Sequence, residues 1–145
     1  MKIIILDTSA IIRLYVPDGP LPNGLEEHVT SAWRGETALF APELALAEIA
    51  QVLWKKEQAG YLNSSEVDEI LFSILELPIE IVGHHEILPD ALLLARRHKL
   101  TIYDSLFLAV ARKKRAKLIT ADKRLEKAFE VKLASDQEGF IKTDL

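Results

Sequence analysis

Residues 2–12 read KIIILDTSAII, and the rest of the chain can be interpreted around them. Four apolar residues, Ile3 to Leu6, run without alternation, which predicts a strand buried on both faces of a parallel sheet. Asp7 follows at once, and a helical pattern starts behind it. We therefore expect a carboxylate at the carboxyl end of a central strand, where open α/β sheets bind ligands. The alternative is that Asp7 only caps the helix that follows.

Short apolar strands and helical patterns alternate along the whole chain. Further strands are expected at 37–40, 79–82, 118–120 and 131–133, and helices at 25–33, 43–58, 64–75, 87–98, 101–115 and 122–129. This alternation predicts an α/β fold, a three-layer α/β/α sandwich with a mostly parallel, roughly five-stranded sheet. We expect one domain over residues 1–134 and a polar tail over 135–145.

The composition narrows the class of protein. A length of 145 residues suits one domain with a sizeable core. The absence of cysteine excludes disulfides and thiolate metal sites, and it is compatible with the expected cytoplasmic location. No apolar run approaches the roughly 18 residues of a spanning helix, so no membrane role is expected. A net charge of −4 argues against a surface that attracts nucleic acid everywhere, but allows an acidic metal pocket with local basic patches.

Three further acids stand at positions where chemistry is plausible. Glu48 lies in the helix PELALAEIAQVLWKK, Asp104 in LTIYDSLFLAVA and Asp122 in KLITADKRL. Each has a structural alternative. Glu48 can face solvent, Asp104 fits a capping box with Thr101, and Asp122 can be a helix N-cap.

The sequence lacks two common motifs of other functional sites. The chain has no Gly-rich phosphate loop and no H-E-x-x-H spacing. His84 and His85 are interpreted as loop residues.

Topology predicts that the acids converge. In a parallel sheet with helical crossovers, strand ends and helix starts meet at one edge. Asp7, Asp104 and Asp122 are expected there, and Glu48 can reach in from a flanking helix. Carboxylates that share a pocket repel one another and need protonation or a cation. Oxygen ligands suit Mg²⁺ or Mn²⁺, which activate water and stabilise the transition state of phosphodiester hydrolysis.

The same segments carry a family resemblance. ILDTSAII at residues 5–12, P-x-L-x-x-x-E at 42–48, LTIYDSLFLAVA at 100–111 and LITADKRL at 118–125 resemble the PIN domain family. In size and layout the chain resembles the toxin ribonucleases of VapBC toxin–antitoxin pairs. The resemblance implies an RNA substrate, products with 5′-phosphate and 3′-hydroxyl ends, and a small antitoxin whose tail enters the active-site groove.

The resemblance also assigns residues. Asp7, Glu48, Asp104 and Asp122 would form the acidic quartet that binds Mg²⁺ or Mn²⁺. Thr8 and Thr120 match polar positions beside it. Gln51 stands where the family often has Asn, so its longer amide would have to keep a similar hydrogen bond near Glu48.

Basic residues near the acids are candidates for RNA phosphate contacts. Arg96, Arg97 and Lys99 come shortly before Asp104, and Lys123 and Arg124 follow Asp122. The run at 112–115 is instead assigned to a helix carboxyl terminus, where its charge opposes the helix dipole.

Partner binding and function retain alternatives. Trp33, Trp54 and Tyr61 are expected in the core, and an antitoxin or dimer surface is the alternative. A homodimer is expected. Besides a toxin, the chain could be a PIN nuclease without antitoxin or a noncatalytic binding module. A receiver-type phosphoacceptor domain is more distant, because the strand at 79–82 ends in Gly83 rather than Asp.

Overall fold

A computed structural model describes residues 1–123, 125–127 and 129–130 and contains a parallel sheet. Its strands are β1 (Lys2–Leu6), β2 (Thr37–Pro42), β3 (Ile79–Val82) and β4 (Lys117–Ile119), in the order β3-β2-β1-β4. All pairings are parallel, which confirms the α/β class. Within the described ranges the sheet has four strands, one fewer than expected. The expected strand at 131–133 and the tail at 135–145 lie outside the described residues.

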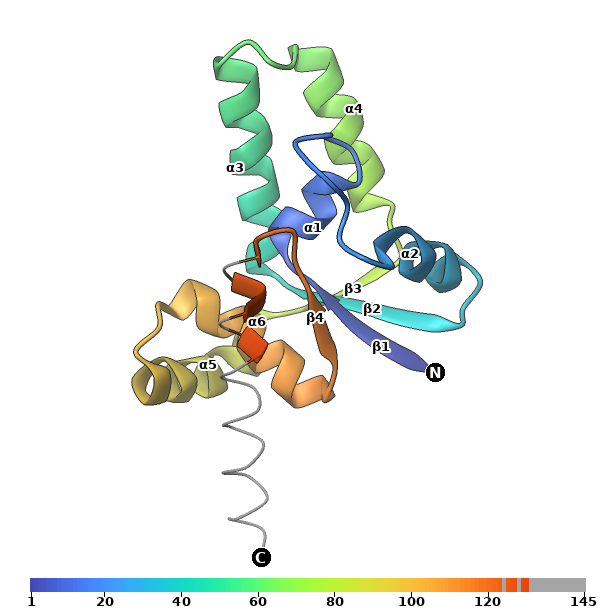
Figure 1. The fold of residues 1–145 in the computed structure, drawn as a ribbon. Helices are drawn as coiled ribbons and strands as arrows, with labels where there is room; N and C mark the ends of the chain where they lie inside the picture. The colour runs from blue at the N-terminus through green and yellow to red at the C-terminus, as the bar shows by residue number, and fades with distance from the viewer. Residues whose placement is uncertain (124, 128, 131–145) are drawn as a thin grey trace, which may run out of the picture.

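Helices cover both faces of this sheet (Figure 1). They are α1 (Thr8–Arg13), α2 (Leu25–Trp33), α3 (Leu44–Gln58), α4 (Ser64–Leu75), α5 (His84–His98) and α6 (Ile102–Lys114). The chain steps from β1 to β2 to β3 in one direction and then returns across the sheet to β4. Because such crossovers are right-handed, α1 to α4 lie on one face and α5 and α6 on the other. None of the described helices has the length and apolar character needed to cross a membrane.

The reversal of direction places a topological switch point between β1 and β4. The ladder between these strands pairs Leu6 with Ile119, and the Asp7 N–H donates to the Ile119 carbonyl at 3.1 Å. Both strands end there, one residue before Asp7 and Thr120 respectively. Ligands of open α/β sheets bind at such points, where neighbouring crossovers leave a crevice.

Burial explains why these segments form the core. Ile4, Ile5 and Leu6 of β1 are almost fully buried, as the unbroken apolar run predicts. In α6 every residue from 105 to 111 is buried, so this helix lies rigidly against β1, β2 and β4. Its first turn therefore presents Asp104 from a fixed position.

Several expected element bounds need correction. Strand β2 extends through Pro42 rather than ending at residue 40. Helix α5 begins at His84, so His84 and His85 belong to its first turn and are not loop residues. The reason is that Gly83 is extended and the His84 N–H donates to the Glu43 side chain at 3.1 Å, which starts the helix early. Strand β4 ends at Ile119 rather than at 120 because the Thr120 side chain turns toward Asp7.

The core assignment of three aromatic residues is wrong. Trp33 is 61% exposed, Trp54 48% and Tyr61 79%. Trp33 ends α2, Tyr61 lies in the turn between α3 and α4, and Trp54 follows the buried Leu53 on α3. All three side chains are therefore largely exposed rather than part of the core.

Candidate active site

Asp7 is buried at the switch point and accepts three hydrogen bonds. Its side chain is the N-cap of α1, with Oδ1 accepting from the Ala10 N–H at 2.9 Å. The same oxygen accepts from the Ser9 hydroxyl at 2.8 Å, and Oδ2 accepts from the Thr120 hydroxyl at 2.5 Å. The side chain of Asp7 therefore both caps α1 and belongs to the candidate site.

Backbone groups determine how the two hydroxyls point. The Ala121 N–H donates to Ser9 Oγ at 2.9 Å, and the Asp122 N–H donates to Thr120 Oγ1 at 3.1 Å. Each hydroxyl has one proton to donate, and each has a carboxylate oxygen of Asp7 within reach. The two hydroxyl oxygens lie 3.0 Å apart, so together they clamp Asp7 and join the ends of β1 and β4.

Glu48 reaches the site from α3. Its side chain is partly buried, and its Oε1 accepts from the Thr8 hydroxyl at 2.8 Å. Thr8 opens α1, directly after Asp7. The hydrogen bond therefore connects the helix that Asp7 caps with the helix that carries Glu48, and Glu48 is not simply a solvated surface acid.

The two remaining acids begin helices at the same edge. Asp104 lies in the first turn of α6, where its N–H donates to the Thr101 side chain at 3.1 Å. Asp122 accepts from the Leu125 N–H at 3.2 Å and so caps the helical residues that follow it. Asp122 is therefore an N-cap, as its alternative interpretation held. For the capping box of Thr101 and Asp104, the structure shows the hydrogen bond to the Thr101 side chain. Both acids also face the cavity described next.

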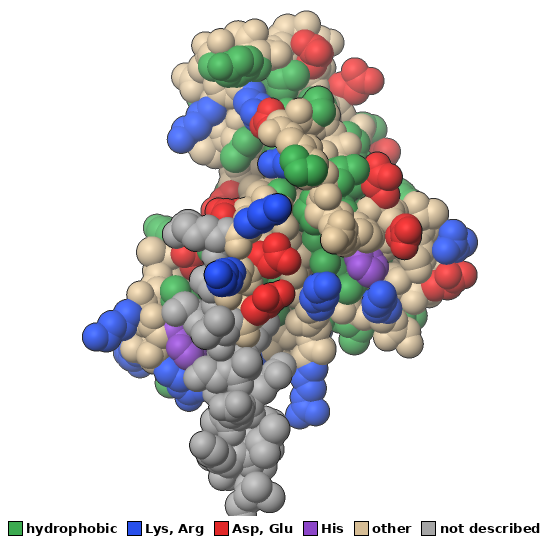
Figure 2. Space-filling model, viewed as in Figure 1, with side chains coloured by type: hydrophobic (Ala, Val, Ile, Leu, Met, Phe, Trp, Pro, Cys, Tyr) green, Lys and Arg blue, Asp and Glu red, His purple; other side chains and the backbone are tan. Residues whose placement is uncertain are grey.

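All four acids line one cavity of about 300 Å³. Thr8, Ser9, Ile12, Arg13, Asp18, Val52, Phe107 and Leu125 complete its lining. Four polar lining residues are followed about one helical turn later by an apolar one: Thr8 by Ile12, Glu48 by Val52, Asp104 by Phe107 and Asp122 by Leu125. Figure 2 shows acidic side chains gathered near the middle of the visible face, with Lys and Arg side chains beside them.

Burial and mutual repulsion raise the pKa of two of these acids. The pKa of Asp7 is raised mainly by burial and further by the charge of Asp122, against the effect of its three hydrogen bonds. The pKa of Glu48 is raised mainly by burial, with added repulsion from Asp7 and Asp104, although the Thr8 hydroxyl opposes this. The negative charges of neighbouring acids therefore act on both Asp7 and Glu48.

The donor set suits a hard divalent cation. All the acidic side chains offer oxygen, and a cation would relieve both the burial cost and the repulsion. Within the described ranges, no three acidic or histidine side chains stand close enough to hold a metal ion as a group. In this arrangement both oxygens of Asp7 accept hydrogen bonds from the protein.

The other residues expected at the site divide into two groups. Thr8 contacts Glu48 and Thr120 contacts Asp7, whereas Gln51 is exposed and does not line the cavity. The basic candidates Arg96, Arg97, Lys99 and Lys123 are exposed outside the lining, and Arg124 is outside the described residues.

Sequence reasoning missed three lining residues, Ser9, Arg13 and Asp18. The spacing in the sequence could have indicated Arg13. It follows Ser9 by four residues, which places the two side chains on one face of a helix.

Comparisons with known proteins agree with this architecture. A protein named Ribonuclease VapC3 from Pyrobaculum aerophilum is 34% identical over 131 residues, covering 89% of this chain and 95% of that protein. The crystal structure of PAE2754 from Pyrobaculum aerophilum aligns with a TM-score of 0.65 at 21% identity, covering 92% of this chain and 90% of that one. Mycobacterium tuberculosis VapC20, described as a Sarcin-Ricin loop cleaving toxin, aligns with a TM-score of 0.58 at 17% identity, covering 86% and 94%.

The two solved structures share the fold of this chain, including its arrangement of sheet and helices. The sequence pattern of the PIN domain matches residues 4–130, which includes all four acids of the cavity. The Pyrobaculum relative extends this agreement over nearly the whole of both chains. The chain belongs to the PIN domain family.

Proposed function

We propose that this chain is a metal-dependent endoribonuclease that hydrolyses phosphodiester bonds of RNA. The observation that carries the proposal is the convergence of Asp7, Glu48, Asp104 and Asp122 on one cavity at the switch point of the sheet. Carboxylates in this number repel one another, and so they are costly for the fold unless chemistry requires them. Attack of water on the phosphorus with cleavage of the P–O3′ bond would leave a 5′-phosphate and a 3′-hydroxyl.

Relatives support the biological setting. The protein that is 34% identical is named Ribonuclease VapC3, and a structural neighbour is described as a toxin that cleaves the Sarcin-Ricin loop. We therefore propose that this chain is the toxin of a type II toxin–antitoxin pair, with a small antitoxin as its partner. A homodimer and a cytoplasmic location belong to the same proposal.

Asp7, Glu48, Asp104 and Asp122 would hold the cation, Mg²⁺ or Mn²⁺. When bound, such an ion supplies an activated water and neutralises charge on the phosphoryl oxygens. The hydroxyls of Ser9 and Thr120 orient the carboxylate of Asp7, and the Thr8 hydroxyl orients that of Glu48. Val52, Phe107 and Leu125 add apolar walls beside the three acids other than Asp7, and apolar walls strengthen electrostatic interactions wherever they displace water.

The experiment is cleavage of a panel of cellular RNAs by wild type and Asp7→Asn, in Mg²⁺, in Mn²⁺ and in EDTA. We expect cleavage by wild type with either metal and none in EDTA. Asp7→Asn should fold, because Asn is a good N-cap, but should not cleave. Asp68→Asn, an exposed acid on α4, is the matched control and should cleave like wild type.

Two results would contradict the proposal. Equal cleavage by Asp7→Asn and wild type in Mg²⁺ would remove Asp7 from the catalytic residues. Binding of RNA by wild type without cleavage in any metal would instead indicate a noncatalytic PIN module.

A further inference from the structure

One positively charged side chain lines the acidic cavity together with the four carboxylates. Among the described lining residues, Arg13 is the only Arg or Lys. It lies in the last turn of α1, four residues after Ser9 and so on the same face, about 6 Å further along the helix axis. Arg13 therefore stands at the wall of the cavity, one helical turn away from the Asp7 clamp.

The guanidinium of Arg13 is held in place but is not neutralised. Its Nη1 donates to the Pro20 carbonyl at 3.0 Å. In the part of the chain that the structure describes, Arg13 has no ion pair with any acid of the cavity. A guanidinium has five N–H donors in a planar fork, so most of them stay available to a ligand.

The loop between α1 and α2 is shaped around this side chain. A Cβ added at Gly19 would lie 2.6 Å from Nη1 of Arg13, so a side chain at position 19 would displace the guanidinium. The loop has a second tether, in which Lys56 of α3 donates to Asp18 at 2.5 Å. This ion pair also neutralises the one acid that the loop contributes to the cavity.

We propose that Arg13 binds an RNA phosphate that flanks the scissile one, and so acts as a substrate-binding residue of the proposed ribonuclease. A guanidinium fork matches the oxygens of a phosphodiester and keeps its charge at every working pH. RNA that enters a cavity with four carboxylates meets repulsion at the phosphates that the cation does not cover. Arg13 would offset that repulsion from within the lining of the cavity, where it is the only Arg or Lys among the described residues.

The test measures binding separately from cleavage. A fluorescein-labelled single-stranded RNA of twelve nucleotides is titrated with wild type, Arg13→Gln and Arg13→Lys in Ca²⁺ at several salt concentrations. The integrity of the RNA is checked after each titration. We expect Arg13→Gln to weaken binding about tenfold, since it loses a charge-assisted contact. The slope of log affinity against log salt should decrease by about 0.7, the value for one phosphate contact on a single strand. Arg13→Lys should fall between the two, because it keeps the charge and loses the fork.

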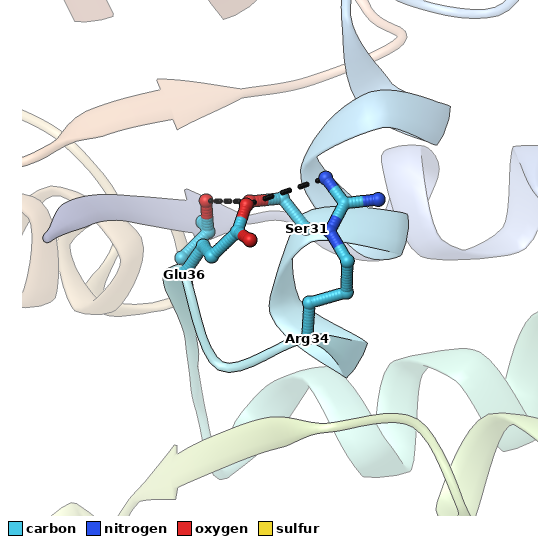
Figure 3. A network of polar contacts seen from close by, with 4 residues as sticks. Ser31, Arg34 and Glu36 are labelled. Atoms are coloured by element: carbon cyan, nitrogen blue, oxygen red, sulfur yellow. Dashed lines mark hydrogen bonds and ion pairs between the residues drawn. The ribbon is translucent and has the colours of Figure 1, made fainter.

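Arg34→Gln is the matched control for loss of one positive charge. Arg34 lines a different cavity, beside α2, and pairs with Glu36 at 3.3 Å (Figure 3). Its substitution should leave RNA affinity unchanged. An equal loss in Arg34→Gln would mean that only net charge matters and would overturn the role of Arg13.

A second control separates phosphate binding from support of the loop. Amide hydrogen exchange of residues 14–24 is compared in wild type and Arg13→Gln, because it reports on the order of the loop without changing another residue of the cavity. The exchange rates should be similar in the two proteins. If the loop of Arg13→Gln exchanges much faster and Arg13→Lys, at the wild-type exchange rate, binds RNA like wild type, the effect comes from the loop, and the proposal is wrong. A poly-glutamate peptide that binds in an Arg13-dependent way would likewise show that the site prefers carboxylates.

This inference rests on the proposed ribonuclease function, but the two fail differently. If wild type does not cleave RNA in any metal, the ribonuclease proposal fails. If wild type cleaves and Arg13→Gln shows the same KM and affinity, only the role of Arg13 fails. The expected result is a raised KM with a smaller change in kcat, because Arg13 would contact a phosphate away from the reacting bond.

Discussion

The hydroxyl of Thr8 donates to Oε1 of Glu48 at 2.8 Å, although the two residues are forty positions apart in sequence. Thr8 follows Asp7 directly, so this hydrogen bond positions the carboxylate of Glu48 relative to the acid that caps α1. The family position normally taken by Asn is Gln51 here, and it faces solvent. In this chain Thr8 therefore has the orienting role toward Glu48.

Thr8→Val should lower kcat/KM for RNA cleavage about fivefold. A hydrogen bond to a partly exposed charged group contributes about 1 kcal/mol, and the pKa of Glu48 should rise further when this bond is lost. Thr8→Ser retains the hydroxyl and should cleave like wild type. Steady-state kinetics of the three proteins, with a carbon-13 NMR titration of Glu48, would measure both effects. Equal rates for Thr8→Val and wild type would contradict this role.

The raised pKa of Asp7 predicts the direction in which the free energy of unfolding changes with pH. In the unfolded chain Asp7 loses its proton near the ordinary value of 3.8, whereas burial makes the folded protein keep it to a higher pH. Between these two pKa values the folded state binds more protons, so the free energy of unfolding falls as pH rises. The contribution of Asp7 is thus most favourable below its ordinary pKa and is lost above its folded pKa.

Denaturant unfolding of wild type and Asp7→Asn from pH 3 to 8 would isolate this effect. The stability of wild type relative to Asp7→Asn should decrease with rising pH and then level off. Mg²⁺ added at neutral pH should restore stability to wild type and have little effect on the variant. A difference that stays constant or increases with pH would disprove the assignment.

Ser9→Ala should destabilise the protein by about 1–3 kcal/mol and lower its cleavage rate. The substitution removes a donor to Asp7 and leaves the Ala121 N–H without the acceptor it has in the fold. Ser73→Ala is a suitable control, because Ser73 lies within α4 and only donates to the carbonyl one turn earlier. Its effect should stay within about 0.5 kcal/mol. Urea unfolding of both variants measures the difference, and similar losses would mean that the clamp is unimportant.

Removal of Arg96 and Arg97 together should weaken RNA binding and flatten its salt dependence. Both side chains are exposed near the carboxyl end of α5, on the chain just before α6 and Asp104. Each phosphate contact on single-stranded RNA adds about 0.7 to the salt slope. Lys113→Gln/Lys114→Gln, at the far end of α6, removes the same charge and should change the slope less. An unchanged slope in the Arg96 and Arg97 variant would exclude these residues from the RNA path.

The general plan of the site could be predicted because it depends on local signals. The unbroken apolar run before Asp7 and the short strand expected at 118–120 before Asp122 predicted two strand ends, and parallel topology brings such ends to one edge. Right-handed crossovers then fix which acids share that edge. The place of Glu48 could not be predicted from these local signals alone, since its inward orientation depends on the hydrogen bond from the Thr8 hydroxyl.

Details that depend on side-chain direction could not be predicted in the same way. Gln51 and Val52 follow Glu48 by three and four residues, and both spacings are compatible with its face of the helix. The cavity is lined by Val52 and leaves Gln51 in solvent. The Ser9 contact with Thr120 spans 111 positions and requires knowledge of how β1 pairs with β4. Exposure of Trp54 similarly depends on which side of α3 packs inward.

The position of β4 in the chain has a consequence during translation. The first acid of the cavity is made almost at once, but the clamp needs Thr120, and Asp122 comes later still. A nascent chain on the ribosome can form β1, β2 and β3 while the site between β1 and β4 is still missing. Synthesis must pass residue 122 before the quartet is complete. If the chain is the proposed ribonuclease, no RNA can be cleaved by a nascent chain that ends before residue 122.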